Sequence, residues 1–309
     1  MKCTRCKAPA QVQLRAHNSN FCRDCFIFFF QRQVERAIEK EHMFRRDEAV
    51  LVAVSGGKDS LALWEVLHGL GFQTTGLHLS LGIGSYSDVS TEKTAAFAAA
   101  HDLPLITVRL AEAGMAVPEV AGLTRRPACS ACGTMKRHYF DQLAIDRGFP
   151  VVATGHNLDD EAARLLGNVL HWQMPYLARQ KPVLEPTHPR FVRKVKPLFR
   201  VGEYEAAIYA FLRGIDYVVD ECPNAVGATQ LVYKDMLNRL EAASPGSKLT
   251  FVQDFLARAQ PALPAASDDG PPQTCTQCGM PAFGEVCGYC RLLRETETRR
   301  ERRAASGAA

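Results

Sequence analysis

The residues with the clearest potential for chemistry form one short run, Ser55-Gly56-Gly57-Lys58-Asp59-Ser60. Its two glycines lack the Cβ atoms that would keep a polyanion away from the backbone. An apolar segment at 50–54 precedes the run and a helical pattern follows it, so the turn opens a helix whose first N–H groups are unpaired. The serines and the lysine add donors, and the aspartate can hold magnesium or its waters. We predict a phosphate site, with a spacing unlike Walker A; the alternative is a turn that only packs a helix on a sheet.

Eight of the eleven cysteines form two sets with matched spacing. Each set consists of two C-x2-C pairs near one terminus: Cys3, Cys6, Cys22 and Cys25, and Cys275, Cys278, Cys287 and Cys290. Two such pairs supply the four thiolates of a closed tetrahedral zinc site. Because that site has no open coordination position, we predict one Zn²⁺ in each of two small terminal modules, which are structural or binding modules rather than catalytic ones. Iron is the alternative metal.

The remaining cysteines are Cys129, Cys132 and Cys222. Three thiolates suit a 4Fe-4S cluster that keeps one iron open for a further ligand. Three other interpretations fit the same spacing. They are a persulfide on one cysteine that another resolves, a third zinc completed by water or a carboxylate, and ordinary buried thiols.

A second polar group follows the predicted strand 151–154, as Gly155-His156-Asn157-Leu158-Asp159-Asp160-Glu161. The carboxyl ends of parallel strands meet at one edge of a sheet, so the two aspartates should lie beside the phosphate site. They could bind magnesium, transfer protons or cap the helix that follows. Capping explains one aspartate, and we predict a metal-binding or catalytic role for at least one of them.

Alternating strand and helix patterns predict the fold class, which is α/β with a doubly wound parallel sheet and small zinc modules at both termini. The predicted strands are 50–54, 74–81, 105–110, 151–154 and 217–219. The predicted helices are 32–46, 58–70, 91–101 with Thr91 as its cap, 135–146, 203–213, 231–240 and 251–259. Loops are predicted at 82–87 and 111–128.

These elements divide the chain into seven predicted parts. They are a zinc finger at 1–30, a linking helix at 31–48, a catalytic domain at 49–222, a helical extension at 223–262, a linker at 263–272, a second zinc finger at 273–292 and a basic tail at 293–309. Residues 179–200 carry many basic side chains and only one acid, Glu185, and their prolines keep them irregular. Such a loop predicts a contact with an RNA backbone, or else a solvated surface. The basic tail allows the same two interpretations.

Length, composition and charge limit the class of protein to which the chain can belong. The chain has 309 residues, 47% of them hydrophobic, which is enough for a sizeable core. Its formal net charge of +4 is too small to indicate a nucleic-acid partner by itself. Early basic residues interrupt any secretory signal, and no apolar run approaches the ~18 residues of a membrane span. We therefore expect a cytoplasmic protein without a membrane segment.

The order of the motifs resembles that of the tRNA 2-thiouridine synthetases of the pyrophosphatase-loop ATPase family. Zinc pairs are followed by S-G-G-K-D-S, by C-x2-C with a lysine four residues later, by G-H-N-L-D-D-E-A, by E-C-P-N-A and by zinc pairs again, over residues 1–292. The chain is most similar to the members that thiolate 5-methyluridine in the T-loop. The 2-thiocytidine synthetases share the core but lack the zinc pairs, whereas wobble-uridine thiolases are close relatives.

The resemblance implies roles for individual residues. ATP would be bound by Ala53, Ser55, Gly56, Gly57, Lys58, Asp59, Ser60, Leu79, Lys136 and Gly155. A 4Fe-4S cluster would be held by Cys129, Cys132 and Cys222. Direct catalytic help would come from Asp59, Lys136 and Asp160.

The resemblance also implies a reaction. With ATP and Mg²⁺, the enzyme would adenylate the C2 oxygen of a tRNA uridine, and sulfur delivered through the cluster would replace it. The sulfur would come from a ubiquitin-like carrier protein with a C-terminal thiocarboxylate, and the enzyme would be a homodimer. Other functions fit the same residues. They are thiolation of a wobble uridine, adenylation coupled to amidation, and zinc-dependent binding of nucleic acid without catalysis.

Overall fold

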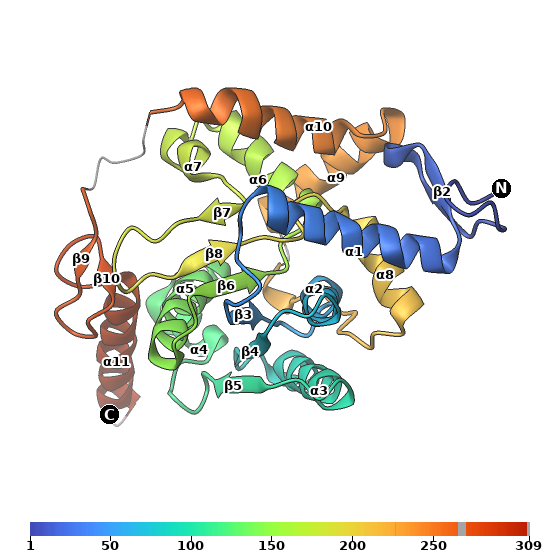
Figure 1. Cartoon of the computed structure of the whole chain (residues 1–309). Coiled ribbons are helices and arrows are strands. Elements are labelled where there is room, and N and C mark those ends of the chain that lie inside the picture. The colour runs from blue at the N-terminus through green and yellow to red at the C-terminus, as the bar shows by residue number, and fades with distance from the viewer. Residues whose placement is uncertain (226, 265–269, 308–309) are drawn as a thin grey trace.

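The computed structural model describes residues 1–225, 227–264 and 270–307. Its centre is a six-stranded sheet with the strand order β5-β4-β3-β6-β8-β7 (Figure 1). Neighbouring strands run parallel except β7, which pairs antiparallel with β8. The strands are β3 (Val50–Ala53), β4 (Thr74–Ser80), β5 (Leu105–Arg109), β6 (Val151–Thr154), β7 (Val183–Leu184) and β8 (Arg193–Val195). The predicted α/β class with a mostly parallel sheet is confirmed.

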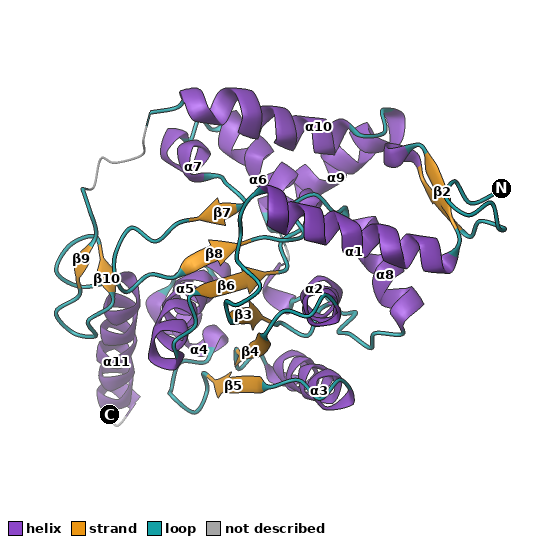
Figure 2. Cartoon of the chain, in the orientation of Figure 1, coloured by secondary structure: helices purple, strands orange, loops and turns teal. Residues whose placement is uncertain are grey.

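Helices cover both faces of the sheet, because successive side chains of each strand point to opposite sides. Val50 and Val52 of β3 join one core with α2 (Lys58–Gly69), α8 (Glu203–Arg213) and part of α3 (Gly84–Ala100). Leu51, between them, joins another core with α5 (Ala128–Arg147). Figure 2 shows helices on both sides of the strands.

A further group of helices packs around α6 (Leu158–Leu170), which follows β6. Its other members are α7 (Met174–Arg179), α9 (Thr229–Ala243) and α10 (Ser247–Asp254), and two short helical segments at Phe255–Ala259 and Gln260–Ala262 continue α10. The helix that carries the two predicted aspartates is thereby held by the helical extension.

Small cysteine modules lie at opposite ends of the molecule (Figure 1). The N-terminal module contains β1 (Val12–Leu14), a short 3-10 turn at Arg15–His17, β2 (Ser19–Phe21) and the start of α1 (Arg23–Lys40). The predicted helix start at residue 32 is wrong. Phe26 and Phe30 are fully buried against the central core, so the aromatic run belongs to α1. The C-terminal module contains β9 (Gln273–Thr274), β10 (Pro281–Ala282) and the start of α11 (Gly288–Gly307).

Two predicted loops contain helices. In the first, α3 begins at Gly84, so Thr91 lies inside the helix and donates to the carbonyl of Ser87 at 2.8 Å instead of capping. Ser87 in turn accepts the N–H of Ile83 at 2.8 Å and stabilises this early start. The second loop contains α4 (Val117–Thr124), which has a proline in its first turn, where the missing N–H costs little. Both loop predictions are wrong because glycine, with serine in the first loop and proline in the second, lowers the apparent helix propensity.

Two boundaries near the cysteines also differ from prediction. The helix predicted from residue 135 begins at Ala128, directly after Pro127, so Cys129 and Cys132 lie in the first turns of α5 rather than in a knuckle before it. The strand predicted at 217–219 is absent from the described structure there. The N–H of Val218 donates instead to the carbonyl of Gly56 at 2.9 Å.

The basic tail is part of the packed structure. Helix α11 runs through it, and Leu292 and Thr296 are fully buried. Arg300 donates to Glu119 of α4 at 2.8 Å, so the helix is fixed against the body. The predicted linker at 263–272 includes residues 265–269, which lie outside the described residues. Within the described ranges, no helix is both long and apolar enough to cross a membrane.

Candidate active site

The order of the strands reverses between β3 and β6, since β4 and β5 lie beyond β3 whereas β8 and β7 lie beyond β6. In open α/β sheets, ligands bind in the crevice at the carboxyl ends of the strands at such a point. Residues 54–60 follow β3 and residues 155–161 follow β6. Both predicted polar groups therefore lie at this crevice.

The turn after β3 is shaped by close contacts that only glycine permits. Gly56 has a φ of +79°, and a Cβ atom there would lie 2.8 Å from the carbonyl oxygen of Ser90 in α3. The Ser90 hydroxyl donates to the carbonyl of Ser55 at 2.7 Å, which fixes α3 against the turn. Gly57 provides no side-chain cap for α2, so the first N–H groups of the helix remain available to an anion.

The strand β6 approaches the start of α2 equally closely. A Cβ atom on Gly155 would lie 2.9 Å from the amide nitrogen of Ser60 and 3.0 Å from the carbonyl carbon of Asp59. Ser60 is itself fixed, because its hydroxyl accepts the N–H of Ser55 at 3.1 Å and donates to the carbonyl of Gly57 at 2.9 Å. The two predicted polar groups thus pack so closely that no side chain fits at Gly155, and the Asn157 amide donates to Asp59 at 3.1 Å.

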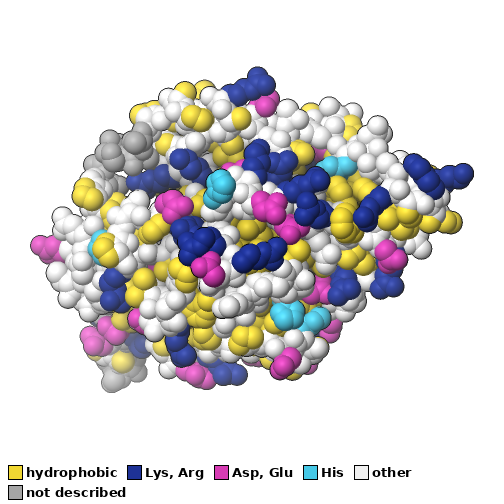
Figure 3. All heavy atoms as spheres, viewed as in Figure 1, with side chains coloured by type: hydrophobic (Ala, Val, Ile, Leu, Met, Phe, Trp, Pro, Cys, Tyr) yellow, Lys and Arg dark blue, Asp and Glu magenta, His cyan; other side chains and the backbone are white. Residues whose placement is uncertain are grey.

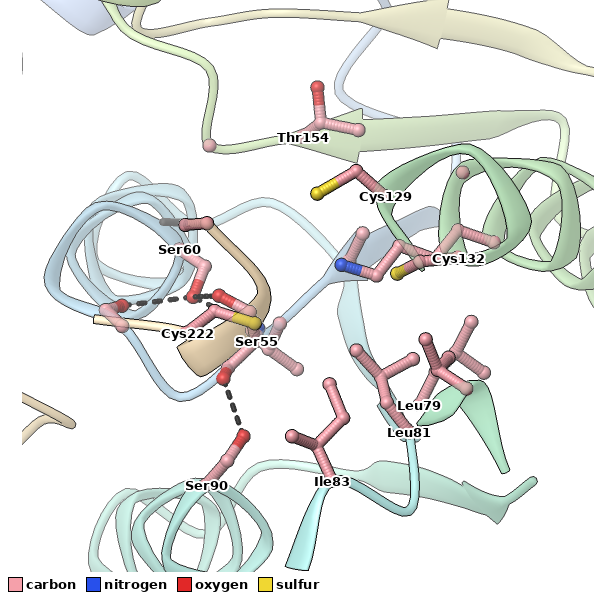
Figure 4. A pocket seen from close by; sticks show the side chains of 18 of the residues that line it. Ser55, Ser60, Leu79, Leu81, Ile83, Ser90, Cys129, Cys132, Thr154 and Cys222 are labelled. Atoms are coloured by element: carbon pink, nitrogen blue, oxygen red, sulfur yellow. Dashed lines mark hydrogen bonds between the residues drawn. The ribbon is translucent and has the colours of Figure 1, made fainter. Parts of the chain in front are cut away.

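A cavity of about 630 Å³ opens at this crevice (Figure 4). Most of the residues predicted from the sequence line it, namely Ala53, Ser55, Gly57, Asp59, Ser60, Leu79, Cys129, Cys132, Lys136, Gly155, Asp160 and Cys222. Gly56 and Lys58 were predicted to bind the same phosphates, but they are not among the lining residues. The glycine turn and the three leftover cysteines therefore share one cavity, although long stretches of sequence separate them.

The cysteines reach the cavity from two directions. Cys129 and Cys132 lie in the first turns of α5, and their spacing of three residues places them on one helix face, with Lys136 one turn further on. Cys222 enters from the segment after α8, and Figure 4 shows its sulfur beside the Ser55 turn. Burial raises the pKa of the Cys132 thiol, and the nearby Lys136 ammonium opposes this effect.

The spacing of these sulfurs bears on the metal that they suit. Zn–S bonds of about 2.3 Å hold the sulfurs of a tetrahedral zinc site about 3.8 Å apart. Among the described residues, the cysteine trio forms no group whose ligand atoms all lie within 4.8 Å of one another. At least two of these sulfurs therefore lie further apart than the ligands of a single zinc ion, which argues against a third zinc. Apolar side chains of Leu81, Ile83 and Val117 also line the cavity and would shield a cluster bound there from water.

In both terminal cysteine sets, by contrast, the sulfurs lie close together. In each, the four sulfurs lie within 4.8 Å of one another, as a single metal ion requires. The distances from Cys6 to Cys22 and from Cys278 to Cys287 are both 3.6 Å, close to the spacing around zinc. The two sets can therefore each hold one ion.

A chain of alternating charges runs along one side of the cavity. The Lys58 ammonium lies 3.0 Å from Asp59 and 2.8 Å from Glu203 of α8. Lys234 of α9 lies 3.1 Å from the other oxygen of Glu203 and 2.7 Å from Asp160. Burial raises the pKa of the Asp59 carboxyl, and the Lys58 charge opposes this shift. The phosphate-loop lysine is thus held by a carboxylate outside the cavity lining.

The two aspartates after β6 have different roles. Asp160 accepts the N–H of Asn157 at 3.1 Å and caps α6, yet it also lines the cavity. Asp159 is buried, accepts the N–H of Glu203 at 2.7 Å and binds the Lys248 ammonium. Capping of α6, the helix that follows, therefore holds for Asp160, which also faces the cavity. Asp159 instead accepts an N–H at the start of α8.

Sequence reasoning missed three residues at this site. His156 lines the cavity, and burial together with nearby cations lowers its pKa to about 4, so the imidazole is neutral at pH 7. Its Nδ1 lies 2.8 Å from the Thr154 hydroxyl. Only its place between Gly155 and Asn157 in the sequence hinted at a role. Glu203 and Lys234 carried no local signal, because each looks like an ordinary charged residue of an amphipathic helix.

The basic stretch at 179–200 is largely neutralised within the molecule. Acids from distant elements bind four of its side chains, in the pairs Arg190–Asp146, Arg193–Glu48, Lys194–Asp141 and Lys196–Glu161. Lys196 and Glu161 are buried together. These four side chains therefore have acidic partners within the molecule, and the RNA contact of this stretch stays a prediction.

Comparison with known proteins agrees with this geometry. Residues 2–27 match the family described as 2-thiouridine synthetase TtuA, N-terminal LIM domain, and residues 29–227 match the PP-loop domain family. A tRNA-5-methyluridine(54) 2-sulfurtransferase of Thermus thermophilus is 50% identical to the chain over 94% of its length and 91% of the relative. A protein of the same name from Pyrococcus horikoshii is 42% identical, over 94% of the chain and 93% of the relative.

A solved structure is similar over nearly the whole chain. It is the U34-tRNA thiolase NcsA from Methanococcus maripaludis with its 4Fe-4S cluster. The TM-score is 0.80 and the sequence identity 25%, over 95% of this chain and 96% of that one.

Proposed function

Because the chain belongs to the family of tRNA-5-methyluridine(54) 2-sulfurtransferases, we propose that it replaces the C2 oxygen of a tRNA uridine with sulfur at the expense of ATP. The observation that carries the proposal is the single cavity in which the Ser55–Ser60 turn faces Cys129, Cys132 and Cys222. The proposed substrate is 5-methyluridine in the T-loop of tRNA. The relatives at 41–50% identity are named as 2-sulfurtransferases of tRNA 5-methyluridine 54.

The turn after β3 would bind ATP and activate the base. The C2 oxygen of uracil is a poor leaving group, and adenylation converts it into AMP, which leaves readily. The free N–H groups of α2 and the Ser55 and Ser60 hydroxyls would hold the phosphates. Asp59 and Asp160 would hold Mg²⁺, and Lys136 would face the charge that develops on the α-phosphate.

Cys129, Cys132 and Cys222 would hold a 4Fe-4S cluster, leaving one of its irons without a protein ligand. When bound, the cluster supplies an iron at which inorganic sulfide can be kept for transfer. The chain's own contribution is the apolar shell, which excludes water from the activated base so that water does not compete with sulfur.

The two terminal sets of four cysteines would each hold one Zn²⁺ as structural ions. The proposed sulfur donor is a ubiquitin-like carrier protein with a C-terminal thiocarboxylate. The proposed assembly is a homodimer, and the proposed location is the cytoplasm. These proposals rest on the family, and a relative from Chlamydomonas reinhardtii at 32% identity is named cytoplasmic tRNA 2-thiolation protein 1.

Thiolation of the wobble uridine is the second candidate. The solved relative is a U34-tRNA thiolase, and its fold matches over 95% of this chain. The chemistry would be the same, so that only the choice of base would differ. The higher identity to proteins named for position 54 favours the T-loop base. Binding of nucleic acid without catalysis is disfavoured, because the turn, the carboxylates and the cysteines all meet in one cavity.

Mass spectrometry of tRNA from cells that lack the protein tests the proposal. We expect loss of 2-thio-5-methyluridine at position 54 and normal thiolation at position 34. The gene for the wild-type chain should restore the modification, and the gene for Cys222→Ala should not. Loss at position 34 alone would support the second candidate. Unchanged thiolation at both positions would overturn both enzymatic assignments.

A further inference from the structure

Cys222 lies in a segment that is held near the Ser55–Ser60 turn at two points, one before the cysteine and one after it. Before it, the N–H of Val218 donates to the carbonyl of Gly56, in the turn after β3, at 2.9 Å. After it, a single 3-10 turn at Pro223–Ala225 leads toward α9. The position of Cys222 therefore depends on how this segment is held at both ends.

The second attachment is made by α9 itself. Gln230, in its first turn, lines the cavity, and Lys234 lies one turn further along the same helix face. The Lys234 ammonium lies 2.7 Å from Asp160 and 3.1 Å from Glu203, and four fifths of the side chain is shielded from solvent. Burial acts to lower the pKa of Lys234, but the two carboxylates outweigh it and raise the pKa, so the side chain is a cation at neutral pH.

Glu203 connects this attachment to the phosphate loop. One of its oxygens lies 2.8 Å from the Lys58 ammonium, and the other lies 3.1 Å from that of Lys234. Lys58 contacts both Asp59 and Glu203, and in the reaction the ATP phosphates would be a further partner. A triphosphate that draws Lys58 into the cavity leaves Lys234 as the remaining cation on Glu203. The number of cations bound to the Glu203 carboxylate thus changes when a nucleotide occupies the site, and with it the charge balance at the contact between Lys234 of α9 and Glu203.

We propose that Lys234 is a positioning residue that couples nucleotide binding to the placement of Cys222, acting through its contact with Glu203. The cysteine is brought to its working position when ATP is bound, and sulfur handling is tied to activation of the base. The inference rests on the proposed function only in placing ATP in this cavity.

A purely structural ion pair is the competing explanation, and the chain contains a matched control for it. Lys248 of α10 binds Asp159, the residue next to Asp160, and also fastens the helical extension to α6. Lys248 does not line the cavity and has no contact with Glu203 side-chain oxygens among the ion pairs of the described residues. Removing either lysine should weaken the attachment of the extension, but only Lys234 contacts the Glu203 carboxylate that holds Lys58. Lys248 reaches Glu203 only through Asp159, which accepts the backbone N–H of Glu203.

The test uses the full-length protein before a cluster is loaded. The rate of iodoacetamide alkylation of Cys222 is followed by peptide mass spectrometry, with and without a non-hydrolysable ATP analogue at a saturating concentration set by calorimetry. In the wild type, the analogue should change the rate by about fivefold or more, the usual range for coupled sites. Lys234→Met and Glu203→Gln should reduce the change to within about twofold. Lys234→Arg should restore it, and Lys248→Met should retain it.

The outcomes distinguish failure of the Lys234 coupling from failure of the proposed function. If Lys234→Met binds the analogue and shows the same change as the wild type, the coupling is overturned, because direct shielding by the nucleotide explains the effect. If Lys248→Met loses the change as fully as Lys234→Met, general loosening of the extension explains it and the coupling is likewise overturned. If the wild-type protein binds no ATP analogue at all, it is the proposed function that fails. Should Lys234→Met not fold, Glu203→Gln, which keeps the size of the side chain, carries the test.

Discussion

Close packing of the backbone at Gly155 allows the residues after β3 and the residues after β6 to meet in one site. The strand end at β6 and the start of α2 touch through main-chain atoms, and neither can move away without shifting a whole element. A side chain at this position would separate Asp59 and Ser60 from the residues after β6. The position therefore demands glycine for space, whereas Gly56 demands it for both space and its positive φ.

The variant Gly155→Ala tests this contact. Its Cβ would lie 2.9 Å from the Ser60 amide nitrogen, which is backbone and cannot rotate away. We expect the free energy of unfolding to fall by about 1–3 kcal/mol, as for other overpacked sites. ATP affinity should fall by about tenfold or more, because the first N–H groups of α2 are displaced. Urea unfolding and calorimetric titration with ATP measure the two effects.

Gly122→Ala is the matched control, since no atom lies within 4 Å of a Cβ there and the residue is inside α4. It should raise stability by about 0.5–1 kcal/mol through helix propensity and leave ATP affinity unchanged. Full ATP affinity in Gly155→Ala would contradict the assignment of this contact to the nucleotide site.

At the scale of elements, α5 connects the active site to the C-terminal module. It carries Cys129, Cys132 and Lys136 on the cavity side. Elsewhere, His138 stacks on Tyr289 with ring centroids 3.9 Å apart, and Tyr139 lies 3.3 Å from the same tyrosine, oxygen to oxygen. Leu292 of α11 is fully buried in the core that Cys132 and Cys222 also contact. The module thus supports the helix that presents two of the cysteines.

Leu292→Ala should therefore loosen α5. Deleting a fully buried leucine costs about 2–5 kcal/mol through lost burial and the cavity that remains. We expect a drop of this size in the free energy of unfolding and faster amide hydrogen exchange in α5 than in α2. Arg302→Ala, on the exposed side of the same helix, should change stability by less than about 0.5 kcal/mol. Equal protection of α5 in Leu292→Ala and the wild type would mean that α11 does not support it.

At the scale of the whole molecule, the two cysteine modules enclose the catalytic core from opposite ends (Figure 1). Basic side chains are visible on the surface near α1 and the N-terminal module, with acidic side chains between them (Figure 3). The modest net charge of +4 agrees with this mixed surface. On the face that Figure 3 shows, basic and acidic side chains are mixed.

Metal analysis of the purified chain tests the modules separately. We expect two zinc equivalents per chain, one for each group of four cysteines. Cys278→Ser should lower the content to about one equivalent, because three thiolates bind zinc much more weakly than four. The N-terminal ion should remain, since its ligands belong to a separate module. Retention of both equivalents in this variant would contradict a zinc site at the C-terminal set.

Much of the site followed from sequence because its signals are local. A glycine turn between an apolar run and a helix, and cysteines in pairs with two residues between them, depend on neighbours in the chain. The strand alternation likewise predicted a parallel sheet, and with it the meeting of residues 54–60 and 155–161 at one edge. The early starts of α3 and α5 escaped prediction, because glycine, serine and cysteine hide helix propensity that tertiary packing overrides.

The sequence by itself determined which chemical groups the protein possesses, and only the tertiary structure decided which of them act together. Lys58 stood in the phosphate motif, yet its ammonium is held by Glu203, a residue of a distant helix. In the basic stretch, Lys194 and Lys196 are paired with Asp141 and Glu161, which lie in other parts of the sequence. Charge pairs between remote segments depend on how elements pack, and no spacing along the chain encodes that packing.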